Sequence, residues 1–194
     1  MFSQLIVSIK SIVAFTLLLG GIYTAVITLV AQTIFHHKAN GSIITRNDKP
    51  IGSALLSQDF DSTYFSARPS AIGYNPMPSS GSNLAPTSAA LKEIVKTRET
   101  QFRSQNSIDS LKTIPSEMIF ASASGVDPHI SPESAFLQMG RIARIRGLSE
   151  VQVNELRGTI VKITENRFLH VLGEARVNVL LLNMELDNIS KKSL

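Results

Sequence analysis

An uninterrupted apolar run near the N-terminus constrains this chain more than any other feature. From Ser11 to Phe35 the sequence contains no Asp, Glu, Lys, Arg or His. A helix rises about 1.5 Å per residue, so about 20 apolar residues cross the hydrocarbon core of a bilayer. Because a helix also satisfies its backbone hydrogen bonds internally, the run predicts one transmembrane helix. Residues 1–35 then form an N-terminal stub and anchor, and residues 36–194 form a single domain on one side of the membrane.

A cleaved signal peptide is the alternative interpretation of this run. Signal peptides have an apolar region of about 7–15 residues, followed by a small-x-small cleavage site. Here the run is longer, and Leu29 lies where such a site needs a small residue. Both observations favour an uncleaved anchor over a signal peptide.

One face of the predicted helix carries small and weakly polar side chains. A four-residue repeat runs along it, formed by Thr16, Gly20, Thr24 and Thr28. Faces of this kind allow two membrane helices to approach closely, and Thr hydroxyls can hydrogen-bond across the contact. The stripe is therefore either a docking face for another membrane subunit or the ordinary Gly and Thr content of a membrane helix.

Composition excludes several kinds of site. The chain has no cysteine, which excludes disulfides, thiolate metal sites and a Cys nucleophile. Its formal net charge of +4 is spread along the sequence without a Lys/Arg run, so it gives no support for nucleic-acid binding. There is no Walker A sequence and no dinucleotide-binding glycine fingerprint, and hence no ATP site of known type.

Orientation in the membrane follows only weakly from charge. Basic residues flank the run on both sides, with Lys10 before it and Lys38 and Arg46 after it. Long domains translocate largely regardless of such charges. A short stub followed by a long domain is the pattern of a signal-anchor, which favours an external domain.

Patterns after the anchor predict a mixed α+β domain. Two short strands are expected on either side of a turn at 46–49, and apolar runs at 114–120 and 177–183 are read as strands. Helical periodicity with capping residues predicts helices over 88–103, 132–146 and 149–163. Three arginines crowd the end of the second of these helices: Arg141, Arg144 and Arg146. They could meet an acidic partner, but a solvated helix end, where the dipole favours cations, is the preferred interpretation.

The segment from Arg68 to Thr87 has four prolines and many serines, which predicts a long loop. It is either a flexible linker or an ordered functional loop. Its apolar and aromatic residues, such as Ile72 and Tyr74, are not typical of a solvated linker and favour the ordered loop.

The most suggestive chemical cluster is Asp127, His129 and Glu133. Carboxylate and imidazole groups together can bind a divalent metal or perform acid–base chemistry, which raises the alternative of a membrane-anchored, metal-dependent hydrolase. No second His lies at ligand spacing. We therefore favour a local role, in which Asp127 makes a turn and Glu133 complements a helix N-terminus.

Several segments, in order, resemble one known family. They include Tyr64-Phe65-x-x-Arg68-Pro69-Ser70-Ala71, Ser80-Gly81-Ser82-Asn83-Leu84-x-Pro86, Ser124-Gly125-Val126-Asp127-Pro128-His129-Ile130-Ser131-Pro132 and Leu172-Gly173-Glu174-x-Arg176-Val177-Asn178-Val179-Leu180-x-Leu182-Asn183. Each motif is weak alone, but their order behind a single membrane helix resembles the C subunit of Kdp-type potassium-transporting P-type ATPases. Ser57 and Ala175 are small departures from the family pattern, where Gly and Pro are expected.

This resemblance implies a non-catalytic accessory subunit of a potassium uptake pump in a bacterial inner membrane. Its partners would be a channel-like subunit and an ATP-hydrolysing subunit, which handle potassium and ATP, while this chain binds no cofactor directly. The N-terminus would be cytoplasmic and the domain periplasmic, supporting assembly and raising ATP affinity indirectly. Expected partner contacts are the helix stripe and four loop residues: Arg68, Asn83, Asp127 and His129. A plain adhesive or scaffold domain without a transport role is a further alternative.

Overall fold

The structure is a computed structural model that describes residues 2–191. It comprises two compact units, Met1–Ile43 and Ile44–Leu194, which are considered separately.

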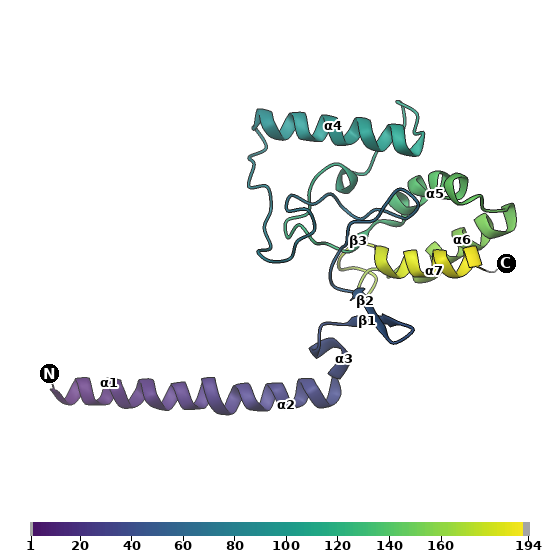
Figure 1. The fold of residues 1–194 in the computed structure, drawn as a ribbon. Coiled ribbons are helices and arrows are strands. Elements are labelled where there is room, and N and C mark those ends of the chain that lie inside the picture. Colours follow the sequence, from purple (N-terminus) through teal and green to yellow (C-terminus); the bar gives the residue numbers. More distant parts are fainter. Residues whose placement is uncertain (1, 192–194) are drawn as a thin grey trace. The chain divides into compact units, whose positions relative to one another are not determined.

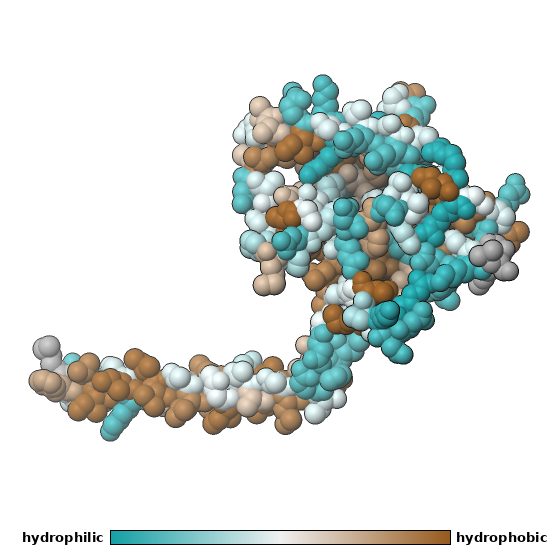
Figure 2. All heavy atoms as spheres, in the orientation of Figure 1, coloured by the Kyte–Doolittle hydropathy of each residue, from teal (hydrophilic) through white to brown (hydrophobic). Residues whose placement is uncertain are grey.

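The first unit is dominated by one continuous helix (Figure 1). It consists of α1 (Phe2–Phe15), a π-helical segment η1 (Thr16–Tyr23) and α2 (Thr24–Ile34). Its 33 residues are long and apolar enough to cross a membrane, and brown apolar side chains cover most of its visible surface (Figure 2). The helix starts at Phe2, nine residues earlier than the sequence predicts, so Lys10 lies within it. A short helix α3 (His36–Ala39) follows a break at Phe35.

The second unit begins with a β-hairpin, as the sequence predicts. Strand β1 (Ile43–Arg46) pairs with β2 (Lys49–Ser53). The two connecting residues, Asn47 and Asp48, both have positive φ angles, of 51° and 60°. Asn and Asp tolerate this left-handed conformation, which a tight two-residue hairpin turn requires.

The predicted helices are confirmed together with their caps. They are α4 (Ala89–Asn106), α5 (Pro132–Arg146) and α6 (Glu150–Ile163). The hydroxyl of Ser131 accepts a hydrogen bond from the Ser134 backbone at the start of α5, and Gly147 ends that helix with a φ of 61°. Ser149 and Gln152 form a reciprocal capping box at the start of α6. These signals are local in sequence, which is why the pattern revealed them.

Two predicted strands are wrong. The segment 114–120 contains a 3₁₀ turn, η2 (Ser116–Met118). The run 177–183 forms only a two-residue strand, β4 (Val177–Asn178), which pairs antiparallel with β3 (His129–Ile130). It then turns into helix α7 (Val179–Lys191), where the Asn178 side chain accepts a hydrogen bond from the Leu181 backbone. The buried residues of α7 recur at helical spacing, at Val179, Leu182, Leu186 and Ile189, so burial along one helix face decides the conformation.

The core lies where α5, α6 and α7 meet β3 and β4, and α4 contributes from one end. Its fully buried side chains include Phe65, Ile130, Ile142, Leu156, Ile160, Val177, Leu182 and Leu186. Phe65 comes from the chain ahead of the long loop, and it is fixed because Asn183 bonds both its backbone groups, at 2.8 and 3.0 Å.

The arginines of α5 correct a further prediction. Arg141 is buried, and its guanidinium donates hydrogen bonds to the side chains of Asn106 and Gln138 and to the backbone carbonyls of Ser62 and Tyr64. It therefore fastens the chain before the long loop onto α5, and the prediction of a solvated helix end is wrong for this residue. The helical period places Arg141 on the inner face, where two backbone carbonyls and two side-chain oxygens accept hydrogen bonds from its guanidinium.

Candidate partner-binding surfaces

The long apolar helix of the first unit carries an open hollow on the predicted stripe. The hollow is lined by Gly20, Gly21, Thr24, Ala25, Thr28, Leu29 and Gln32. Three of the four predicted stripe residues line it, and Thr16, at the start of the π-helical segment, does not. A Cβ atom built on Gly20 or Gly21 would meet nothing within 4 Å. The two glycines therefore leave room for a neighbouring helix to approach the backbone closely.

Local backbone geometry fits this interpretation. The Thr24 hydroxyl donates a hydrogen bond of 2.9 Å to the Leu19 carbonyl, five residues earlier, at the end of the π-helical segment. Widened π-helical turns inside α-helices often occur at functional sites. Here the wide turn holds the glycine pair of the hollow.

Three of the four predicted loop residues come together in the second unit. The Arg68 Nη1 atom lies 3.0 Å from Asp127 Oδ2, although 59 residues separate them. Asp127 Oδ1 accepts a 3.0 Å hydrogen bond from the His129 backbone, and His129 Nδ1 lies 3.6 Å from the same oxygen, beyond hydrogen-bond distance. Burial alone would raise the pKa of Asp127, but its contacts with His129 and Arg68 outweigh burial and lower it. The charged Asp127 side chain therefore joins the start of the long loop, at Arg68, to the turn at residues 127–129.

Asn83 lies outside this cluster. It is exposed and has a left-handed backbone, with a φ of 52°. Across residues 2–191, no hydrogen bond joins its side chain to Arg68, Asp127 or His129. Its predicted contact with a partner remains a prediction.

Hydrogen bonds hold the long loop, residues 68–87, along its length, as expected for an ordered loop rather than a linker. The Ser79 hydroxyl donates a 2.8 Å hydrogen bond to the Ser124 carbonyl, and the Ser122 backbone donates to Pro69 at 3.1 Å. The Tyr74 hydroxyl donates to the Arg68 carbonyl at 3.1 Å. Burial raises the pKa of Tyr74, which keeps this hydroxyl protonated as a donor.

Gly125 permits the closest approach of the two segments. Its φ is 72°, and a Cβ atom there would lie 2.5 Å from Ile72 Cγ1 and 2.9 Å from the Ser80 carbonyl oxygen. Both the backbone conformation and the lack of space therefore require glycine. Beside this crossing lies a hollow of about 440 Å³, which is lined by Ser70, Ala71, Ser82, Leu84, Leu91, Ile94, Arg98, Phe120 and Ala121.

The structure does not assemble a metal site from the suggested cluster. Within the described part of the chain, no three His, Cys, Asp or Glu side chains gather where they could hold a metal ion. Glu133 lies in the first turn of α5, while Asp127 is engaged with Arg68 and His129. Nothing in this geometry supports the hydrolase alternative.

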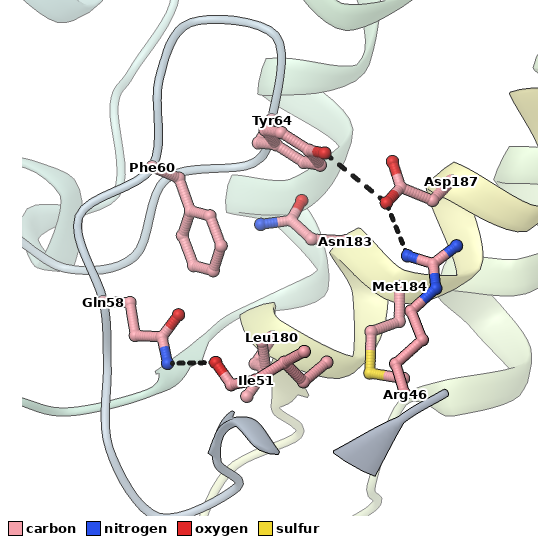
Figure 3. Close-up of a pocket in the computed structure, with 9 residues that line it drawn as sticks. All are labelled: Arg46, Ile51, Gln58, Phe60, Tyr64, Leu180, Asn183, Met184 and Asp187. Atoms are coloured by element: carbon pink, nitrogen blue, oxygen red, sulfur yellow. Dashed lines mark hydrogen bonds and ion pairs between the residues drawn. The ribbon is translucent and has the colours of Figure 1, made fainter. Parts of the chain in front are cut away.

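A second cluster, which no sequence pattern predicted, is centred on Asp187 of α7 (Figure 3). Asp187 accepts hydrogen bonds of 2.9 Å from both Arg46 of β1 and Arg146 of α5, and a longer one of 3.4 Å from the Tyr64 hydroxyl. The Arg146 guanidinium also lies 4.3 Å from the centre of the Tyr64 ring, a cation–π contact. These residues are separated by up to 141 positions, so no local sequence signal could have revealed the cluster.

This Asp187 cluster closes one side of a cavity of about 230 Å³. Figure 3 shows the apolar side, where Phe60, Leu180 and Met184 face the cavity, and Gln58 donating a 3.0 Å hydrogen bond to the Ile51 carbonyl. Gln58 thus joins strand β2 to the segment that follows it, and Arg46 joins β1 to α7. The hairpin is the first element of the second unit, so this cluster fixes the entry of the chain into the domain.

Comparisons with known proteins agree with the resemblance of the sequence motifs. A family model described as "KdpC: K+-transporting ATPase, c chain" matches residues 5–188. The chain is 45% identical over 184 residues to the potassium-transporting ATPase KdpC subunit of Geotalea uraniireducens, covering 92% of this chain and 94% of that protein. It is 44% identical over 188 residues to the KdpC subunit of Geobacter metallireducens, covering 94% and 96%. The corresponding protein of Caldanaerobacter subterraneus is 40% identical over 186 residues, covering 95% of each chain.

Proposed function

Because this chain belongs to the KdpC family, the c chains of potassium-transporting ATPases, we propose that its membrane helix and its domain both dock on other subunits of one pump. The chain is an accessory subunit of that pump and is not itself catalytic. The partners that we propose are the channel-like subunit that passes potassium and the subunit that hydrolyses ATP. Nothing supports a hydrolase.

The proposed topology is a single pass through a bacterial inner membrane, with the N-terminus in the cytoplasm and the domain in the periplasm. A single apolar N-terminal helix followed by a long domain is typical of a signal-anchor. The sequence has no nucleotide-binding motif, and an external domain would have no access to cytoplasmic ATP. We propose that the other subunits handle both ATP and potassium.

An external domain can still raise the ATP affinity of the pump. If the domain binds one conformational state of its partners more tightly than another, it shifts the equilibrium between these states. The effect on ATP is then a coupling free energy, typically about 1–3 kcal/mol, transmitted through the membrane subunits. The Arg46–Asp187–Arg146 cluster suits this role, because it holds the first strand of the domain rigidly on α7.

The observation that carries the docking proposal is the hollow at Gly20, Gly21 and Thr24. Where two membrane helices pack closely, small residues form the contact and hydroxyls hydrogen-bond across it. The hollow is open in the isolated chain and has both kinds of group. A partner helix from the channel-like subunit would fill it.

Replacing Gly20 and Thr24 by Leu tests this docking. The matched control is Ile22→Leu with Val26→Leu, which has the same spacing but lies on roughly the opposite helix face. Loss of about 1–2 kcal/mol of helix contact should lower recovery of the other pump subunits on the order of tenfold, while membrane insertion remains. The control should assemble like the unchanged chain.

Two outcomes would contradict this proposal. If both double variants recover the other subunits equally well, the helix is only a tether. The second outcome concerns ATP. If the Gly20→Leu, Thr24→Leu variant no longer co-purifies with the other subunits and the apparent KM of the pump for ATP is unchanged, the chain does not influence ATP binding.

A further inference from the structure

The segment between α6 and β4 forms a small hairpin rather than a plain connection. Its base is a pair of backbone hydrogen bonds between Glu165 and Arg176, at 2.8 and 3.0 Å. Nearer the tip, the Phe168 backbone donates to the Leu172 carbonyl at 2.8 Å. Leu169 and His170 form the tip, with φ angles of 52° and 61°. We refer to residues 167–173 as the finger.

The finger exposes four large apolar side chains next to one another. The exposed fractions are 69% for Phe168, 72% for Leu169, 74% for Val171 and 60% for Leu172. Single exposed apolar residues are common on proteins, but a contiguous group marks an interaction site. The backbone ladder fixes the backbone that carries these side chains before any partner binds, which lowers the entropy cost of binding.

The charges around the finger indicate what covers it. Arg167 and Glu174 flank the apolar residues, and at the base Arg176 pairs with Glu165 at 2.9 Å. The two positive and two negative charges cancel. Attachment to anionic lipid relies on a local excess of Lys and Arg, which the finger lacks. An apolar centre with a polar rim that includes Arg is instead typical of a protein–protein interface.

We propose that the finger inserts into an apolar depression, rimmed by charges of both signs, on another subunit of the same pump. This inference rests on the proposed function and adds a contact independent of the helix hollow and of the Arg68–Asp127 cluster. Phe168 and Leu169 supply the apolar anchors, and Arg167 and Glu174 pair with charges at the rim. The finger thereby fixes the position of the domain on its partner.

Because the chain contains no cysteine, one introduced thiol reports on one position. Leu169→Cys places a thiol on the finger, and Val171→Cys is a second variant at the same site. The matched control is Leu111→Cys, which replaces an apolar residue that is 93% exposed in the connection after α4. The rate of labelling by a polyethylene-glycol maleimide is read from the gel shift of this chain alone. It is measured for the complete complex, for the full chain in detergent and for the full chain in lipid nanodiscs.

An interface that excludes water should slow labelling of the Leu169→Cys and Val171→Cys variants on the order of tenfold in the complete complex. Labelling of the chain alone should be fast in both detergent and nanodiscs, and the Leu111→Cys control should react fast throughout. A Leu169→Asp, Val171→Asp variant should keep its melting temperature and lose recovery of the other subunits.

Several results would overturn the inference. Fast labelling of the finger thiols in the complete complex would show that nothing covers them. Slow labelling of the chain alone in nanodiscs would show that the bilayer covers the finger. If labelling in detergent slows as the concentration of the chain is raised, a second copy of the chain covers it. If the Leu111→Cys control fails to recover other pump subunits, the proposed function itself fails, which is a separate result.

Discussion

Asp187 offers the sharpest test of how the domain holds the strand that follows the membrane unit. Asp187→Asn keeps the shape of the side chain and removes the charge that Arg46 and Arg146 share. Both guanidinium groups would then lose their counter-charge. The domain should therefore lose stability, although the size of the side chain is unchanged.

The magnitude follows from the burial of the cluster. Exposed ion pairs contribute about 0–1 kcal/mol, and removing one partner of a fully buried pair costs about 3–5 kcal/mol. The Asp187 side chain is 20% exposed, and the side chains of Arg46 and Arg146 are 29% and 13% exposed. The cluster lies between these limits, so we expect a loss of about 2 kcal/mol. For a domain of this size, that corresponds to a fall of about 4–8 °C in melting temperature.

The loss should depend on pH. Burial alone would raise the pKa of Asp187, but hydrogen bonds from Arg146, Arg46 and Tyr64 outweigh burial and lower it. A carboxyl group with a lowered pKa stabilises the fold above its ordinary pKa of about 4, and that stabilisation is lost as the pH falls through the folded-state pKa. The difference in stability between Asp187→Asn and the unchanged chain should therefore be full at pH 7 and shrink below about pH 4.

Thermal unfolding of the full chain in detergent, followed by circular dichroism at pH 7 and at pH 3, measures both effects. Glu185→Gln is the matched control, because it removes an exposed carboxylate from the same helix. Equal melting temperatures for the two variants at pH 7 would refute the role of the cluster. If the difference in melting temperature between Asp187→Asn and the unchanged chain is as large at pH 3 as at pH 7, the stabilisation is not electrostatic.

The remaining predictions concern the loop crossing and the buried arginine. Gly125→Ala should lower the free energy of unfolding by about 1–3 kcal/mol, because of crowding and backbone strain. The control Gly147→Ala, at a similar φ of 61° but in open space, should lower it by only about 1 kcal/mol, from strain alone. Equal unfolding free energies for the two variants would contradict the crowding at Gly125. Arg141→Met should lower the free energy of unfolding by about 3 kcal/mol or more, because four acceptors lose their donor. An unchanged urea midpoint would contradict this prediction. Arg68→Ala and Asp127→Ala should be non-additive in a double-mutant cycle, with a coupling of about 0.5–3 kcal/mol; additive losses in unfolding free energy would show that their 3.0 Å contact contributes nothing.

The sequence was sufficient for features with local causes. The caps at Ser131 and Ser149 and the turn at Asn47 and Asp48 depend on residues a few positions apart, and each is confirmed. The run from Val177 was misjudged because a short apolar run fits a buried strand and a buried helix equally well. Its helical conformation depends on apolar residues further along, which bury one face of α7.

The candidate sites also divide into those with local causes and those that depend on the tertiary fold. The helix stripe could be predicted, because a four-residue period is a local property. The Arg46–Asp187 contact joins residues 141 positions apart and depends on the tertiary fold. The finger is a different case, because its apolar residues were visible in the sequence while their exposure was not. A run such as Phe168-Leu169 looks the same whether it fills a core or projects into solvent.

We propose that this domain acts on the pump from the side of the membrane opposite to ATP. Leu111→Cys tests it most directly, because the residue is 93% exposed in a chain without other thiols. Intact cells that contain the complete pump are treated with a membrane-impermeant maleimide, before and after the inner membrane is permeabilised. The account predicts full labelling of this chain while the inner membrane is intact. Labelling that appears only after permeabilisation would place the domain in the cytoplasm and contradict the account.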